Sequence, residues 1–373
     1  MRTQNTTIEA FFALVRAGLW ETDIRLSDYE PVDFAAIQTL AEDQSVDGLV
    51  AAGLEHVVDQ APEREKLLHY IFQTLYFEKQ NTKMNAFIGK LVNKMQKEGI
   101  HPVLLKGQGI AQCYERPLWR ICGDVDFFLS EEDYQKAKAY LIPKASHVEG
   151  EYVREKHLGM DIGPWVVELH GSLYCGLSSR IEKGLEEIQE DVFSRGGVRY
   201  WMNGDTQVSL PSANNDAVYV FTHILQHFYK GGIGVRQICD WVRLLWTYRK
   251  DIDLALLERR LKAMGLITEW KAFGSFAVEY LGMPVEAMPL YSPDERWKRK
   301  AGRICSFVIE VGNMGQNRDK SYFEKYPYVI RKAISLGHRM GDLSRHARIF
   351  PLDSLRFFPR ILINGIGSSI RGE

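Results

Sequence analysis

Two carboxylates lie one residue apart inside the apolar segment 123–129, which reads Gly-Asp-Val-Asp-Phe-Phe-Leu. Alternate residues of a β-strand project from the same face, so Asp124 and Asp126 would point together while Val125 and Phe127 enter the core. Buried carboxylates without a partner are costly, and a divalent cation bound between them would offset that cost. The alternative is a surface strand whose acids face water.

A third acid, Glu168, lies in a second apolar segment, residues 165–170. Three converging carboxylates can hold two divalent ions about 4 Å apart, one that activates an attacking oxygen and one that stabilises a leaving group. We therefore expect Asp124, Asp126 and Glu168 to be metal ligands and catalytic residues, with Glu168 as a candidate general base. The expected cofactor is a pair of Mg²⁺ or Mn²⁺ ions.

A glycine-containing segment precedes these acids, because the apolar residues 103–105 lead into Lys106, Gly107 and Gln108. Glycine after a strand lets the backbone approach phosphates closely, and a following helix over about 108–114 would offer free N–H groups. Lys106 would neutralise phosphate charge, or it is a solvated residue at the end of a strand. Lys106, Gly107 and Gln108 are therefore candidate nucleotide-binding residues.

These motifs resemble a family of bacterial uncharacterised nucleotidyltransferases within the polymerase beta type superfamily. The resemblance covers residues 5–285. It is carried by Leu105-Lys106-Gly107, Arg120, Gly123-Asp124-Val125-Asp126, Glu168-Leu169-His170, His223, Arg236 and Asp240. It implies an α+β fold, in which a small mixed sheet is flanked by N-terminal and C-terminal helical regions. It also implies transfer of a nucleoside monophosphate from an NTP to an acceptor, with release of pyrophosphate.

The resemblance suggests further site residues. Arg120 would bind a phosphate or form an ion pair with one of the strand acids. His170 shares a strand face with Glu168 and would orient it, contact the base or acceptor, or be structural. His223, Arg236 and Asp240 would line an acceptor pocket.

One further pattern is weaker. His223 and His227 lie four residues apart on a predicted helix, which invites a zinc hypothesis, but no third ligand has the required spacing.

Two other activities remain open on the sequence. A kinase-like phosphotransferase could use the same acids but would release a nucleoside diphosphate. A non-catalytic nucleotide-binding or protein-interaction module would transfer nothing. The acceptor of a nucleotidyltransferase would be a small molecule, a sugar, a peptide or a protein, and the sequence does not choose among them.

Composition restricts the partners. The 373 residues have a formal net charge of −1, which argues against long nucleic acid as a partner. In residues 301–373, however, Lys and Arg outnumber Asp and Glu by 12 to 6. This basic region would dock on an anionic surface or, as we prefer, form packed helices with solvated arginines.

The expected cellular compartment follows from sequence features that we do not find. No apolar run approaches the roughly 20 residues that cross a membrane, and the first residues do not read as a signal peptide. The five cysteines are scattered without metal-binding spacing. We expect a cytoplasmic protein.

The elements that must position the site follow from periodicity. Apolar residues recur at helical intervals through residues 64–97, and strands are expected at 146–154, 157–162 and 165–169 in a mixed sheet. Four regions are predicted: helical residues 1–98, a catalytic core at 99–210, helices at 211–288 that pack on it, and a basic helical region at 289–373.

Overall fold

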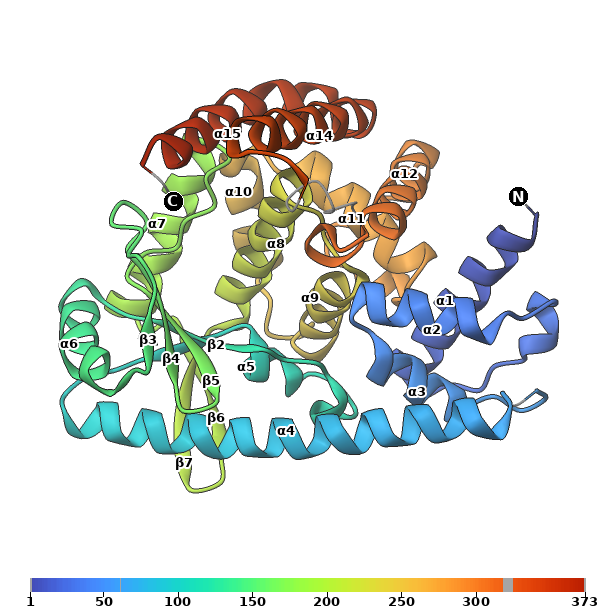
Figure 1. The fold of residues 1–373 in the computed structure, drawn as a ribbon, viewed down its shortest axis with the longest axis horizontal. Helices are drawn as coiled ribbons and strands as arrows, with labels where there is room; N and C mark the ends of the chain where they lie inside the picture. The colour runs from blue at the N-terminus through green and yellow to red at the C-terminus, as the bar shows by residue number, and fades with distance from the viewer. Residues whose placement is uncertain (1, 61, 318–324, 372–373) are drawn as a thin grey trace.

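The computed structural model describes residues 2–60, 62–317 and 325–371. It is a mixed α+β structure in which one sheet lies between a long helix and a large group of helices (Figure 1). The α+β class and the mixed sheet agree with the sequence prediction. In the described ranges, every helix is too short or too polar to cross a lipid bilayer.

Four helices precede the sheet, namely α1 (Arg2–Trp20), α2 (Phe34–Gln44), α3 (Asp47–Glu55) and α4 (Arg64–Lys97). Helices α1 and α3 pack closely because each has a glycine at the contact. A Cβ on Gly53 would lie 2.1 Å from the carbonyl oxygen of Leu14, and one on Gly18 would lie 2.0 Å from that of Leu49. Helix α4 then runs along one side of the molecule to the sheet (Figure 1).

The sheet has seven strands in the order β3-β4-β5-β2-β1-β7-β6. Their bounds are Val103–Leu105 (β1), Asp124–Phe128 (β2), His147–Val148 (β3), His157–Ile162 (β4), Trp165–His170 (β5), Val198–Asn203 (β6) and Thr206–Pro211 (β7). Strands β2 and β5 are parallel, whereas β1 and β2 are antiparallel. The short helix α5 (Gly107–Ala111) connects β1 towards β2, and α6 (Glu131–Leu141) follows β2.

The sequence prediction of a strand over 146–154 was wrong in extent, because β3 contains only His147 and Val148. Beyond it the chain forms a turn in which Tyr152 bridges to His157 and Lys156 adopts a positive φ of 47°. Regular pairing with β4 is therefore interrupted after Val148 and returns only as the single Tyr152–His157 bridge before the turn.

The two faces of β2 have different neighbours. Val125 and Phe127 are fully buried in a core that includes residues of α4, α6 and β5. The carboxylates of Asp124 and Asp126 project from the other face, as alternation along a strand requires. One face therefore stabilises the sheet while the other is left for the site.

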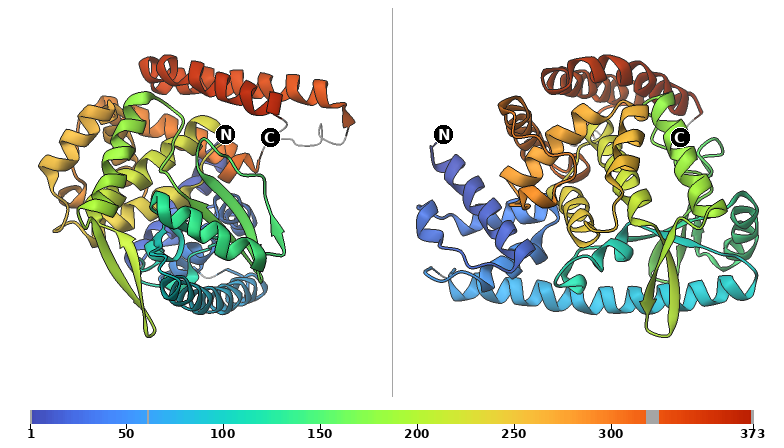
Figure 2. Two further views of the ribbon diagram at one scale, coloured as in Figure 1. Left: turned by 90° about the vertical axis from the view of Figure 1, so that its left-hand side faces the viewer. Right: turned by 180° about the vertical axis from the view of Figure 1, so that it is seen from behind.

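Among the described residues, the helices that follow the central strands are α7 (Ser179–Ser194), α8 (Ala213–Lys230), α9 (Val235–Thr247), α10 (Leu254–Met264), α11 (Ile267–Glu279), α12 (Glu295–Val311), α14 (Tyr328–Ile349) and α15 (Pro351–Arg371). Helices α8, α9 and α11 share a tightly packed aromatic core. In it the ring of Phe221 on α8 lies 5.1 Å from Trp241 and 4.9 Å from Trp270. Helices α14 and α15 lie side by side across one end of the molecule (Figures 1 and 2).

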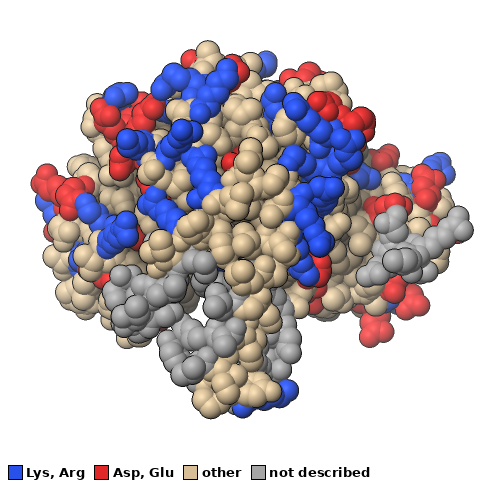
Figure 3. Space-filling view, turned by 90° about the horizontal axis from the view of Figure 1, so that it is seen from above, with Lys and Arg blue, Asp and Glu red and all other residues tan. Residues whose placement is uncertain are grey.

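The predicted basic region includes α14 and α15. Seen from the side that these helices occupy, Lys and Arg side chains gather in several groups, with Asp and Glu among them (Figure 3). The positive charge on this face is therefore divided rather than gathered into one continuous patch.

Candidate active site

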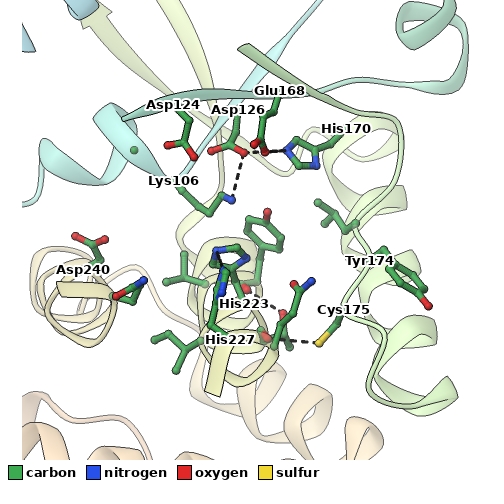
Figure 4. A pocket seen from close by; sticks show the side chains of 18 of the residues that line it. Lys106, Asp124, Asp126, Glu168, His170, Tyr174, Cys175, His223, His227 and Asp240 are labelled. Carbon is green, nitrogen blue, oxygen red and sulfur yellow. Dashed lines mark hydrogen bonds and ion pairs between the residues drawn. The ribbon is translucent and has the colours of Figure 1, made fainter. Parts of the chain in front are cut away.

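The three predicted acids come together on neighbouring strands. Parallel pairing of β2 with β5 sets Asp126 beside Glu168, and Asp124 lies two residues earlier on the same strand face. One carboxylate oxygen from each residue lies within 4.8 Å of the other two (Figure 4). Asp126 is buried, Glu168 is half-buried, and Asp124 occupies the exposed start of β2. The convergence predicted from spacing is observed, and metal binding at these residues stays a prediction.

Two basic side chains lie against Asp126. Lys106 Nζ is 3.3 Å from Asp126 Oδ1, and His170 Nε2–H donates to the same oxygen over 2.8 Å. Burial alone would lower the pKa of both groups, but nearby carboxylates outweigh burial and raise the pKa of each. Lys106 is therefore positively charged at neutral pH, and the same carboxylates favour the protonated form of His170.

Lys106 reaches Asp126 through an unusual backbone turn. Lys106 and Gly107 both have positive φ, 48° and 42°, in the left-handed region that a non-glycine residue rarely adopts. Because Leu105 pairs with Asp126 across β1 and β2, this turn directs the next side chain towards the carboxylates. Of the two alternatives for Lys106, the solvated strand end is excluded, because its side chain is only 16% exposed and lies within the site.

His157 is a site residue that the sequence reasoning missed. Its Nε2 lies 3.1 Å from Glu168 Oε2, and its ring stacks on that of His170 with centroids 4.7 Å apart. The signal was available, because a tight turn at Gly163 and Pro164 places His157 opposite His170. Burial raises the pKa of Glu168, but the hydrogen bonds from both histidines outweigh it and leave the pKa below its usual value.

The carboxylate Asp124 has a different environment. The charge of Asp126, and then burial, raises its pKa. No described side chain donates a hydrogen bond to the Asp124 carboxylate or forms an ion pair with it. This carboxylate is therefore repelled by its neighbour and compensated only at a distance, by Lys106 and Arg236.

The acids line one end of a pocket with a volume of about 400 Å³. This size lies within the range of small-molecule binding sites. His223 and His227 of α8 line the pocket across from the acids (Figure 4), and Tyr219 of the same helix also lines it. The structure thus places a polar cavity next to the carboxylates.

His223 and His227 form a hydrogen-bonded pair, because their Nε2 atoms lie 3.0 Å apart. Burial, followed by the positive charge of Lys106, lowers the pKa of both, and that of His227 falls to about 4. Both rings are therefore neutral at physiological pH. In the part of the chain that the structure describes, no third metal-binding side chain joins them, so the zinc hypothesis has no support.

Arg120 and Asp240 pair with one another. Arg120 Nε and Nη2 donate to the two carboxylate oxygens of Asp240 at 2.8 and 2.6 Å, and Tyr114 Oη–H donates to Asp240 Oδ1 at 2.7 Å. Both charged side chains are buried. The geometry favours the ion-pair alternative for Arg120, but its partner is Asp240 and not a strand acid.

Gln108 points away from the pocket. Its side chain is buried and donates from Nε2 to Asn81 Oδ1 of α4 over 2.7 Å. Asn81 in turn donates to the carbonyl groups of Leu118 and Arg120. The Gln108 side chain therefore helps to hold the loop before β2 against α4 and is not free to contact a phosphate, and nucleotide binding through the Gln108 backbone stays a prediction. Gly107 does line the pocket.

Arg236 lines the same pocket with part of its hydrogen-bonding capacity unused. Nη1 donates to the carbonyl oxygen of Ile121 over 2.7 Å, whereas the buried Nε has no hydrogen-bond partner. Among the described residues, no carboxylate lies within ion-pair distance of this guanidinium. Arg236 therefore retains a charge that a bound anion could compensate.

Comparison with known proteins agrees with this geometry. Neither the comparison with curated proteins nor the comparison with solved structures finds a match. A family model described as uncharacterised nucleotidyltransferase matches residues 30–282, which include every site residue described above. The chain belongs to this uncharacterised nucleotidyltransferase family.

Proposed function

We propose that this chain is a metal-dependent nucleotidyltransferase, which moves a nucleoside monophosphate from an NTP to an acceptor hydroxyl or phosphate and releases pyrophosphate. One observation carries the proposal: Asp124, Asp126 and Glu168 converge within 4.8 Å at the wall of a 400 Å³ pocket beside Lys106. Membership of the family supports the general kind of reaction. The proposal includes a polymerase beta type catalytic core at residues 99–210, with the three other predicted regions as helical additions.

The donor set fits a hard divalent cation. Carboxylate oxygens are the ligands that Mg²⁺ and Mn²⁺ prefer, and Asp124 offers one with no hydrogen-bonding partner of its own among the described side chains. When bound, such ions would neutralise the acids, lower the pKa of the acceptor hydroxyl and offset the charge of the triphosphate. Asp124, Asp126 and Glu168 would hold them.

The remaining residues bind and orient the reactants. Lys106 and Arg236 face the same pocket and would bind the triphosphate, with Arg236 supplying the charge that no described carboxylate compensates. Gly107 would let phosphate oxygens approach the backbone. Arg120, fixed by Asp240, would shape the wall of the pocket.

Glu168 is better suited to hold a cation than to act as the general base. Its lowered pKa keeps it ionised and makes it a weak proton acceptor. His157 and His170 hold its carboxylate from one side, which fixes the direction of its free lone pairs. In the transfer, the acceptor oxygen bonds to the α-phosphorus, the bond to the bridging oxygen breaks, and pyrophosphate leaves while the acceptor proton passes to solvent.

The test uses Asp124→Asn and Asp126→Asn with α-labelled and γ-labelled NTPs and a panel of acceptors. Both variants should lose transfer of the α-label. Asp124→Asn should remain as stable as the parent protein because it removes a repelled carboxylate. Asp161→Asn on β4, which does not line the pocket, is the matched control. Undiminished transfer by Asp126→Asn would overturn the proposal.

The same assay separates the alternative activities. A kinase would transfer the γ-label and release a nucleoside diphosphate instead of pyrophosphate. Calorimetric titration with NTP, with and without Mg²⁺, separates a non-catalytic scaffold from the enzymes, since a scaffold should show no metal-dependent nucleotide binding.

A further inference from the structure

The first half of α4 carries an exposed apolar stripe. It consists of Leu68, Ile71, Phe72, Leu75 and Tyr76, and Phe72 is 68% exposed. The spacing i, i+3, i+4, i+7 and i+8 places all five side chains on one helical face. Lone exposed apolar residues are ordinary, but five large ones on one face mark an interaction surface.

The described part of the chain leaves this stripe exposed. Helix α4 lies along the outer edge of the molecule (Figures 1 and 2). Its opposite face buries Tyr70, Thr74 and Asn81, and packs against α3 and the short 3₁₀ helix Pro117–Trp119. The helix is therefore already anchored on one side, so the stripe is not needed for packing within the chain.

We propose that the stripe binds a second copy of this chain, with the two α4 helices antiparallel about a two-fold axis near Phe72. Charge selects this orientation. Exposed Glu65 lies seven residues before Phe72, and exposed Lys79 lies seven residues after it. Antiparallel pairing centred on Phe72 sets each Glu65 opposite a Lys79 of the other copy. Parallel pairing would instead place Glu65 opposite Glu65 of the other copy and Lys79 opposite Lys79.

The area is sufficient for association. Aromatic side chains bury about 150–250 Å² each when fully covered, so the exposed parts of the five stripe residues offer roughly 500 Å². Two copies together would bury about 1,000 Å², which reaches the lower limit of specific protein interfaces. The same patch serves both partners, as a two-fold interface requires.

The experiment measures the mass of the full-length protein by sedimentation velocity over roughly 0.1–100 µM, where interfaces of modest size associate. The parent protein should show a concentration-dependent dimer. Phe72→Glu should weaken dimerisation at least about thirty-fold, as loss of a central contact does. The matched control is Leu355→Glu on α15, which is also exposed and apolar but outside the stripe, and it should leave dimerisation unchanged.

A charge exchange tests the orientation. Lys79→Glu should weaken the dimer about threefold to tenfold, because two exposed pairs become repulsive. Adding Glu65→Lys in the same chain should restore dimerisation, since the pairs then have opposite charges again.

A parent protein that stays monomeric throughout this range would overturn the proposal. So would a dimer that is indifferent to Phe72→Glu. A dimer that loses affinity with Phe72→Glu but is not restored by the charge exchange would overturn the antiparallel arrangement.

Discussion

Replacing Asp240 by Asn tests whether this residue holds the fold or binds a ligand. Asp240 accepts two hydrogen bonds from Arg120 and one from Tyr114, and the side chains of the ion pair are only 5% and 7% exposed. An amide cannot accept from both guanidinium nitrogens, and its NH₂ group would face a donor. Arg120 would remain charged, buried and incompletely paired.

The expected cost follows from that burial. Removing one partner of a buried ion pair destabilises proteins by about 3–5 kcal/mol, so Asp240→Asn should lower the free energy of unfolding by about 3 kcal/mol or more. Tyr114→Phe removes one neutral donor and should cost about 1 kcal/mol. The double variant Arg120→Met with Asp240→Leu leaves no unpaired charge and should recover much of the loss.

Urea unfolding followed by fluorescence of the eight tryptophans measures these differences. Asp240→Asn within about 0.5 kcal/mol of the parent protein would refute the reasoning, because a surface-like substitution has that size of effect. If that stable variant also lost acceptor binding, Asp240 would belong to the acceptor pocket, as the sequence first suggested. A double variant as unstable as the single one would show that the cost does not come from the unpaired charge.

Three more predictions follow from the same structure. Arg236→Gln should weaken binding of Mg²⁺–NTP by about tenfold to a hundredfold in calorimetry, since a charged hydrogen bond contributes about 1.5–3 kcal/mol, and unchanged binding would remove Arg236 from the phosphate site. The pKa of His227 is about 4 in the folded protein and 6.5 in the unfolded chain. As the pH drops from 6.5 to 4, the unfolded state therefore binds a proton before the folded state does, and the free energy of unfolding falls by at most about 3 kcal/mol. His227→Asn should make urea midpoints less dependent on pH in that window, and an unaltered dependence would contradict the assignment. Gly53→Ala should destabilise the protein by about 2 kcal/mol or more, because the new Cβ would meet the Leu14 carbonyl oxygen. In the control Gly337→Ala on α14, the new Cβ meets no atom within 4 Å. A thermal melt should show this control to be neutral or slightly stabilising.

Local sequence signals predicted the elements well where periodicity was strong. The predicted helix over 64–97 coincides with α4, and the strands that carry the three acids begin where alternation indicated. The acids themselves were recognisable because they lie within apolar strand segments, a pattern that depends only on neighbours along the chain. Their convergence depends on the pairing of β2 with β5, and it was expected from the family resemblance together with this pattern.

The parts that sequence could not supply depend on long-range pairing. Arg120 forms an ion pair with Asp240, which lies 120 residues later, and no local pattern near either residue predicts this pairing. Gln108 was predicted to be part of a phosphate-binding loop, but its side-chain amide donates a hydrogen bond to Asn81 of α4. His157 is an intermediate case, because Gly163 and Pro164 signal the turn between β4 and β5, but the register of that pairing is needed to place His157 opposite His170.

The length of α4 joins two distant regions mechanically. At 1.5 Å per residue its 34 residues span about 51 Å without interruption. Near the middle, Asn81 is hydrogen-bonded to Gln108 and to the backbone of the loop that leads into β2. Any tilt of the first half of this helix must therefore shift or strain that loop, so a partner bound at the outer end of α4 would alter the position of Asp124 at the start of β2.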